Sequence, residues 1–255
     1  MALSGKHPPK KKPKRHKGGH SKPLQPAEAA LIIFTKSPVP GLVKTRLCPP
    51  LAPDEAATLH GSLVLDTLER TRNLQGFDRF LACAPSKQHP FFQTVGARQQ
   101  IELWEQISDA DLGKRMDCAF GAAFERKYTY AVLIGSDLPS IDGETIQQAV
   151  RALAEHDVVI GPSVDGGYYL IGLKQPTPEL FSNIPWSTDQ VSSLTQQIAN
   201  HLELSMKFLP EQRDLDTIED LQVFIQESQG SKTSVISSRT AQVLKTLATR
   251  LVNRE

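Results

Sequence analysis

The sequence predicts an α/β protein, a three-layer α/β/α sandwich around a mostly parallel sheet. Short, continuous apolar runs such as 30–34 and 131–135 are typical of strands that are buried on both faces. Segments with apolar residues at helical spacing lie between these runs, and this alternation indicates a parallel sheet covered by helices on both sides. The length also fits, because 255 residues with 39% hydrophobic content can form the core of one such domain.

The first half of the chain contains three expected strands and two expected helices. The first helix follows a Pro-Asp start, and Leu59, Leu63 and Leu68 recur in it at helical spacing. The second helix places Leu112, Met116, Phe120 and Phe124 on one face. In order, the elements are a strand at 30–34, a helix at 54–72, a strand at 80–84, a strand at 101–104 and a helix at 111–127.

The second half begins with the strongest apolar run and ends with two helices. Two of its strands are separated by Asp165-Gly166, a strong signal for a hairpin turn. Thr217 and Asp220 form a capping pair at the start of the helix expected at 217–228. In order, the elements are a strand at 131–135, a helix at 144–156, strands at 157–161 and 168–173, a helix at 187–202, a strand at 205–209, and helices at 217–228 and 240–252.

The composition divides the chain into three parts. Residues 1–26 carry eight Lys or Arg side chains, five prolines and no acid, so we expect a disordered basic tail. Its run 10–15 fits a nuclear address, an RNA-binding patch or simply a solvated segment. Residues 27–228 contain the sheet and form the expected folded domain, and 229–255 are expected to be a linker and a C-terminal helix. Beyond the tail the net charge is −7, which excludes a general nucleic-acid-binding body.

Several classes of protein and site are excluded. The longest apolar run has six residues, far short of the roughly 18 that a membrane span requires, and no secretory leader is visible. Three cysteines without CxxC-like spacing predict neither a disulfide framework nor a structural zinc site, and they favour a cytoplasmic protein. HExxH and GxSxG are both absent, so zinc-hydrolase and serine-hydrolase chemistry have no support.

Candidate binding residues follow the strands, because ligands of open α/β sheets lie at the carboxyl ends of the strands. The loop after the first strand contains Lys36, Lys44 and Arg46, together with Gly41, which permits a close backbone approach. Cations and backbone N–H groups of this kind bind phosphate, although an ordinary basic surface turn has the same composition. The spacing is not that of a Walker A loop.

Carboxylates follow two later segments. Asp137 ends the strong strand and is suited either to hold a divalent cation or to cap the next helix. Asp214 and Asp216 lie two residues apart, so in an extended segment both point to one side, where they can complete a metal site begun by Asp137.

The segment 165–168 and the residues near Trp186 are ambiguous. Asp165-Gly166 is explained by a plain hairpin turn, but two glycines also allow a substrate to approach the backbone. Trp186 fits a core position as well as a stacking platform. Ser187 or Thr188 is a candidate helix cap or a substrate contact.

In their order along the chain, these motifs resemble the nucleotide-diphospho-sugar transferase superfamily with its Rossmann-like GT-A fold. Within it, the chain is most similar to the bacterial glycosyltransferase-like family often associated with arsenosugar biosynthesis. The resemblance covers about 29–225 and rests on segments 34–47, 111–116, 135–139, 161–172 and 186–188. Segments 44–47 and 214–221 are also similar to elements of guanylyltransferases. One departure is that the Asp-x-Asp motif of the superfamily reads Gly135-Ser136-Asp137 here.

The resemblance implies a role for each matched residue. The expected nucleotide-binding residues are Lys36, Gly41, Lys44, Thr45, Arg46, Gly113, Gly135 and Ser136. The expected ligands of Mg²⁺ or Mn²⁺ are Asp137, Asp214 and Asp216. The expected sugar or acceptor contacts are Asp165, Gly166, Gly167, Tyr168, Trp186, Ser187 and Thr188. Lys44 and Arg46 are expected to stabilise charge during transfer, and Asp165 is the candidate that orients or deprotonates the acceptor.

The expected function is therefore a metal-dependent transferase, specifically a glycosyltransferase with a sugar-nucleotide donor and a small-molecule acceptor. A nucleotidyltransferase that joins a nucleotide to a phosphorylated acceptor and releases pyrophosphate is the first alternative. A non-catalytic nucleotide-binding protein is the second, because fold alone does not determine function. No membrane partner is expected, and nucleic acid is expected to contact only the basic tail.

Overall fold

The computed structural model describes residue 1 and the ranges 27–230 and 238–252. The predicted tail, apart from its first residue, and most of the predicted linker lie outside these residues. The strands of the sheet are β1 (Ala29–Lys36), β2 (Phe77–Ala84), β3 (Glu102–Glu105), β4 (Tyr130–Gly135), β5 (Val158–Pro162), β6 (Tyr168–Leu173) and β7 (Met206–Phe208).

These seven strands form one sheet in the order β3-β2-β1-β4-β6-β5-β7. β6 is antiparallel to both of its neighbours, and every other pairing is parallel. The mostly parallel sheet is therefore confirmed. The antiparallel strand follows from the hairpin between β5 and β6, since a short turn can join only antiparallel strands.

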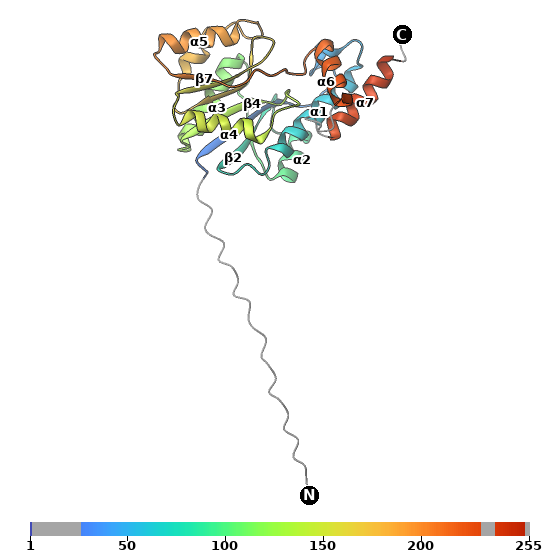
Figure 1. The fold of residues 1–255 in the computed structure, drawn as a ribbon, viewed down its shortest axis with the longest axis horizontal. Coiled ribbons are helices and arrows are strands. Elements are labelled where there is room, and N and C mark those ends of the chain that lie inside the picture. Colours follow the sequence, from blue (N-terminus) through green and yellow to red (C-terminus); the bar gives the residue numbers. More distant parts are fainter. Residues whose placement is uncertain (2–26, 231–237, 253–255) are drawn as a thin grey trace.

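Helices cover both faces of the sheet (Figure 1). The α-helices are α1 (Pro53–Arg70), α2 (Pro90–Gln99), α3 (Leu112–Glu125), α4 (Gly143–Leu153), α5 (Val191–His201), α6 (Ile218–Gly230) and α7 (Ser238–Val252). Two short 3₁₀ turns, η1 (Thr45–Leu47) and η2 (Pro178–Phe181), complete the described elements. The α/β/α sandwich is thus confirmed.

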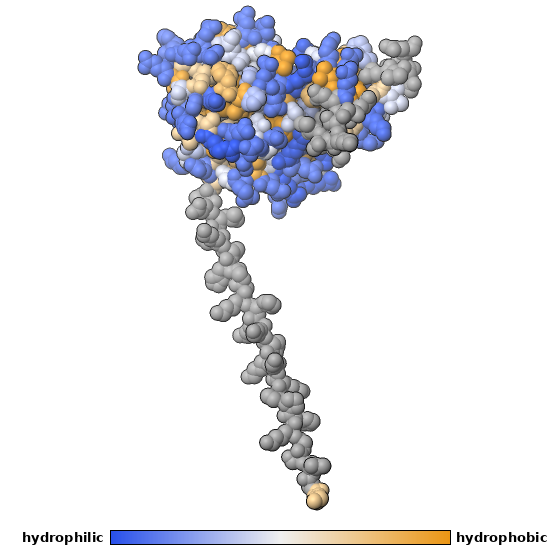
Figure 2. Space-filling model, viewed as in Figure 1, coloured by the Kyte–Doolittle hydropathy of each residue, from blue (hydrophilic) through white to orange (hydrophobic). Residues whose placement is uncertain are grey.

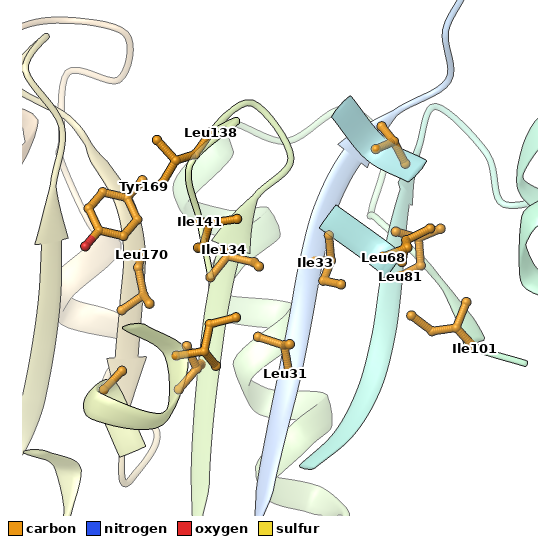
Figure 3. Close-up of a cluster of buried hydrophobic side chains, with 14 of the residues drawn as sticks. Leu31, Ile33, Leu68, Leu81, Ile101, Ile134, Leu138, Ile141, Tyr169 and Leu170 are labelled. Carbon is orange, nitrogen blue, oxygen red and sulfur yellow. The ribbon is translucent and has the colours of Figure 1, made fainter. Parts of the chain in front are cut away.

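Alternation along β1 shows how the sheet divides the core. Leu31 and Ile33 point to the face that α1, α2 and α4 cover, and they are fully buried there. Figure 3 shows Leu81 and Ile134 of the neighbouring strands in the same cluster. Ile32 and the other alternate residues of β1 point to the opposite face, where α3 and α5 pack. Successive side chains of a strand point to opposite faces, and both faces of this sheet are covered, so neighbouring residues of β1 are buried in different clusters.

A third apolar cluster lies on the outer side of α1. Leu59 and Leu63 of α1 belong to this cluster, together with Leu221 of α6 and Leu244 of α7. In Figure 1, α6 and α7 lie beside α1, away from α5 and β7. The last helix therefore packs onto the same body as the sheet.

The structure differs from the sequence prediction at two helices, α2 and α5. α2 was not predicted, because it has only ten residues and just Phe92, Val95 and Gly96 buried, too few to give a clear helical period. α5 begins at Val191 with Gln190 at its N-cap, so the capping interpretation of Ser187 or Thr188 is wrong. Ser187 has φ of 66° and lies in a turn instead.

The surface shown in Figure 2 is mainly hydrophilic, with hydrophobic residues in smaller areas between polar ones. Within the described ranges, no helix combines the length and the apolar character needed to cross a membrane.

Candidate functional site

A cavity of about 810 Å³ lies at the carboxyl ends of β1 and β4. These two strands are parallel neighbours, so the loops that follow them meet at one edge of the sheet. On one side, the cavity is lined by residues of segment 36–46 and by residues 135–137 at the end of β4. On the opposite side, it is lined by residues near the β5–β6 turn and before α5, including Asp165, Tyr168, Ser187 and Thr188. It is the place where sequence reasoning located the ligand site.

The loop after β1 adopts two left-handed backbone conformations. Gly41 has φ of 78°, a region that glycine enters without steric cost. Lys44 has φ of 48° and directly precedes η1, whose Leu47 is fully buried and anchors the turn. The loop therefore turns sharply at Lys44 and directs this side chain inward, while Lys36 and Arg46 remain exposed.

Lys44 joins two carboxylates that are distant in the sequence. Its Nζ lies 2.5 Å from Oδ1 of Asp137 and 2.7 Å from Oδ1 of Asp216, and its side chain is only 3% exposed. The backbone N–H of Leu215 donates to the carbonyl of Asp137 at 3.0 Å, which brings the segment of Asp216 alongside. Asp137 does not cap the next helix, because Asp142 occupies the N-cap of α4.

Charge pairing shifts the pKa values of this cluster. Burial lowers the pKa of Lys44, but the attraction of Asp137 and Asp216 outweighs it, and the pKa is raised overall. Loss of hydration acts to raise the pKa of Asp137, yet Lys44 and His60 hold it below its usual range. Lys44 is thus firmly protonated and Asp137 firmly ionised.

Asp214 behaves differently from its neighbour Asp216. It does not line the cavity, whereas Asp216 does. Burial, with the negative charges of Asp137 and Asp216 nearby, raises the pKa of Asp214 to about 8. Of the predicted pair, the structure therefore brings Asp216 into contact with Lys44 and leaves Asp214 outside the cavity lining.

Two buried polar residues of the site were missed by sequence reasoning. His60 of α1 is 5% exposed, places Nε2 2.9 Å from the carbonyl of Lys36, and has Nδ1 3.5 Å from Oδ1 of Asp137. Gln106 donates its amide to the carbonyls of Ala82 and Thr35 at 2.7 and 3.3 Å. The available signal was a polar residue beside an apolar helical face or just after a short strand, which is too common to single out a site.

The opposite wall contains Asp165 in a tight turn. Oδ1 of Asp165 accepts hydrogen bonds from the Ser163 hydroxyl at 2.5 Å and from the Gly167 N–H at 3.0 Å. Gly166 has φ of 85° and lies so close to the Asp189 backbone that a Cβ atom would stand 2.2 Å from the Asp189 carbonyl oxygen. The hairpin turn is therefore confirmed, and its Asp165 lines the cavity, whereas Gly166 and Gly167 do not.

The remaining predicted residues divide into lining and supporting positions. Thr45, Gly135, Ser136, Tyr168, Ser187 and Thr188 line the cavity. Gly41, Gly113, Gly166, Gly167 and Trp186 do not. Trp186 packs against the core cluster under α3, and a Cβ atom on Gly113 would lie 2.6 Å from its ring, so the two support the wall together. Arg115 also lines the cavity and was not predicted.

The donor chemistry of Asp137 and Asp216 suits Mg²⁺ or Mn²⁺, which prefer carboxylate oxygens. The arrangement is not a ready cage, however, because the Lys44 ammonium lies between the two carboxylates. Within the described ranges, no group of three or more His, Cys, Asp or Glu side chains is arranged to hold a metal ion. Substrate oxygens would have to supply the rest of the coordination.

Comparison with known proteins places the chain in a family. Residues 67–188 match a family model described as an uncharacterised protein conserved in bacteria, DUF2064. No curated protein matches the chain. The chain is similar to a solved structure of a candidate nucleotide-diphospho-sugar transferase from Desulfovibrio desulfuricans G20, with 32% identity, a TM-score of 0.81 and coverage of 89% of this chain and 98% of that one.

More distant solved structures share the fold. A cytidylyltransferase from Leptospira borgpetersenii aligns with a TM-score of 0.51 at 14% identity, over 88% of this chain and 95% of its own. A CMP:2-keto-3-deoxy-manno-octonic acid synthetase complexed with CTP aligns with a TM-score of 0.50 at 12% identity, over 77% of this chain and 96% of its own. These two structures show the fold alone, whereas the 32% identity to the Desulfovibrio relative shows that the chain belongs to the nucleotide-diphospho-sugar transferase family.

Proposed function

We propose that the protein is a transferase that uses a sugar nucleotide as donor and a small hydroxyl compound as acceptor, with Mg²⁺ or Mn²⁺. The observation that carries this proposal is the charge layout of the cavity. Exposed cations lie at the end of β1 and on the loop after it. Asp137 after β4 and Asp216 before α6 form an acid pair, and a further carboxylate, Asp165, lies on the opposite wall.

Lys36 and Arg46 are suited to bind the diphosphate of the donor. Both are exposed, both line the cavity, and neither forms an ion pair with any residue in the described ranges. Charge-assisted hydrogen bonds to phosphate are among the strongest polar contacts available to a protein. Their positive charge would also stabilise the negative charge that develops on the leaving nucleotide.

Asp165 is suited to orient the acceptor. Its Oδ1 is held by Ser163 and Gly167, whereas its Oδ2 accepts no hydrogen bond from the described part of the chain. A carboxylate fixed through one oxygen can accept the proton of a substrate hydroxyl with the other. Asp137 and Asp216 would hold the metal ion, which supplies a positive charge that offsets the diphosphate.

Nucleotidyl transfer is the alternative that the residues favour next. Segments 44–47 and 214–221 are similar to elements of guanylyltransferases, and the structure brings Lys44 and Asp216 from these two segments into contact. The same cations would then bind a nucleoside triphosphate, and pyrophosphate would leave. The supporting geometry is common to both reactions, so the identity of the bound ligand decides between them.

The test is a thermal-shift panel of sugar nucleotides and nucleoside triphosphates, each with and without Mn²⁺. A ligand at 100 times its Kd stabilises the folded state by about 2.7 kcal/mol, which is readily measured. Stabilisation by a sugar nucleotide, followed by its turnover with acceptor compounds, supports glycosyl transfer. Stabilisation by a triphosphate alone, with pyrophosphate release, supports the alternative. Binding without either turnover would contradict both reactions.

Matched arginine variants locate the binding. Arg46→Ala should weaken binding of the responding nucleotide by about 10- to 100-fold, because it removes a charge-assisted hydrogen bond. Arg98 is also exposed but lies on α2 and does not line the cavity, so Arg98→Ala should leave the affinity unchanged. Equal losses in the two variants would contradict the assignment of the phosphate site.

We also propose a cytoplasmic location, supported by three cysteines that are all free.

A further inference from the structure

The Lys44 ammonium occupies a position that resembles a metal site. Its Nζ contacts one oxygen of Asp137 and one of Asp216 at 2.5 and 2.7 Å, and it is enclosed with 3% exposure. The two carboxylates themselves remain about 40% exposed toward the cavity. A positive charge therefore bridges the two acids from within the protein, while their other oxygens still face the space where a ligand enters.

Backbone contacts hold all three groups in place. The backbone of Lys44 is left-handed, which directs its side chain inward. The Lys44 carbonyl accepts a hydrogen bond from the Leu47 N–H at 3.0 Å. Asp137 and the segment of Asp216 are joined by the hydrogen bond from the Leu215 N–H. The bridge is thus built into the loops rather than formed by a freely moving surface lysine.

A divalent cation cannot share this position with the ammonium. Mg²⁺ and Mn²⁺ bind carboxylate oxygens at about 2.0–2.2 Å, which is closer than the Lys44 nitrogen lies to the same oxygens. A metal ion bound there would lie within a few ångströms of the Lys44 ammonium, and the two positive charges would repel each other strongly. The two acids also provide too few ligands for six-fold coordination, and the described residues offer no third acidic or histidine ligand group for the same ion. A metal ion alone therefore gains little here, whereas phosphate oxygens would both complete its coordination and attract the displaced lysine.

We infer that Lys44 is a resident cation that takes the place of the divalent ion between Asp137 and Asp216 in the ligand-free protein. Mg²⁺ or Mn²⁺ alone then binds weakly, and the ion enters together with a phosphate ligand to which Lys44 turns. The position of Lys44 between the two acids concerns the protein without nucleotide and does not depend on the proposed function. Only the coupling to phosphate rests on the proposed function.

The test is a titration of the full chain with Mn²⁺ and no nucleotide, with free Mn²⁺ followed by electron paramagnetic resonance. Lys44→Met should bind Mn²⁺ at least about tenfold more tightly than the wild type, because it leaves two facing carboxylates without their cation. The double variant K44M/D137N should lose this gain. Lys36→Met removes the same charge from the same cavity without touching either acid, and it should change the Mn²⁺ affinity by no more than about twofold.

Tight Mn²⁺ binding by the wild type, equal to that of K44M, would overturn the inference, as would an equal gain in K36M. If K44M does not fold, the wild type still tests the inference through its thermal shift with Mn²⁺, with pyrophosphate, and with both. A shift with both that exceeds the two separate shifts combined supports the coupling, and a saturating shift with Mn²⁺ alone contradicts it. Failure of every nucleotide to bind would reject the proposed function but not the K44M result.

Discussion

Gly166 provides a sharp test of how closely the two loops of the far cavity wall pack. Its φ of 85° lies in the region that residues with a Cβ atom rarely adopt. In addition, a Cβ atom would lie 2.2, 2.5 and 2.6 Å from the carbonyl oxygen, Cα and carbonyl carbon of Asp189. Because these are backbone atoms, no side-chain rotation can relieve the overlap.

The expected cost of Gly166→Ala combines two effects. The left-handed conformation costs about 1–2 kcal/mol for alanine. Overpacking against a rigid neighbour typically adds about 1–3 kcal/mol. Gly76 is the matched control, because its φ is 83° but a Cβ atom there would meet nothing within 4 Å. Gly76→Ala should therefore lose only the cost of the left-handed conformation. The difference in unfolding free energy between the two variants measures the contact with the Asp189 loop.

Denaturation in urea gives the free energy of unfolding of both variants, and an unchanged m-value shows that the two-state comparison holds. Gly166→Ala should be the less stable variant by about 1–3 kcal/mol. It should also bind the responding nucleotide or acceptor less tightly, because Asp189 lines the cavity and must move. Equal stability losses in the two variants would refute the reasoning and show that the Asp189 loop yields freely.

Three further predictions concern residues outside the cavity. Hydrogen bonds from Lys174 and Ser205 lower the pKa of Asp157 to about 2, so its contribution to stability should be complete above about pH 4 and lost as the pH falls toward 2. Asp157→Asn should remove this dependence, at most about 2 kcal/mol, in acid denaturation curves. Burial raises the pKa of the Cys83 thiol to about 12, so a colorimetric thiol reagent at pH 8 should not label it until the protein is denatured. Asp66→Ala should cost about 2–4 kcal/mol and increase hydrogen exchange in α7, because buried Asp66 accepts hydrogen bonds from Thr240; unchanged exchange would contradict this docking.

Much of the sheet could be predicted because its strands are apolar on both faces. β1 and β4 were recognised from continuous runs such as Leu31–Phe34, which need no knowledge of their neighbours. The cap of α6 was equally local, since Asp220 accepts from the Thr217 N–H and hydroxyl, and that prediction is confirmed. α2 could not be predicted in the same way, because its apolar face is short and weak.

The candidate site was predictable in position but not in its pairings. The rule that ligands bind at the carboxyl ends of strands selected the loops of Lys44, Asp137 and Asp165 from residue order alone. The sequence could not show that Lys44 is paired with two acids, while Lys36 and Arg46 stay exposed. Nor could it show that His60 approaches Asp137 from α1.

The amino-acid sequence by itself determined the α/β class, the hairpin at Asp165-Gly166 and the polar composition of the loops at one edge of the sheet. These features depend on neighbours within a few positions, where backbone preference and apolar spacing act directly. Only the tertiary structure decided that Lys44 meets Asp216, a residue 172 positions away, and that the neighbouring Asp214 stays outside the cavity lining. Such contacts depend on how whole elements pack, because charges enclosed together must find partners in space rather than along the chain.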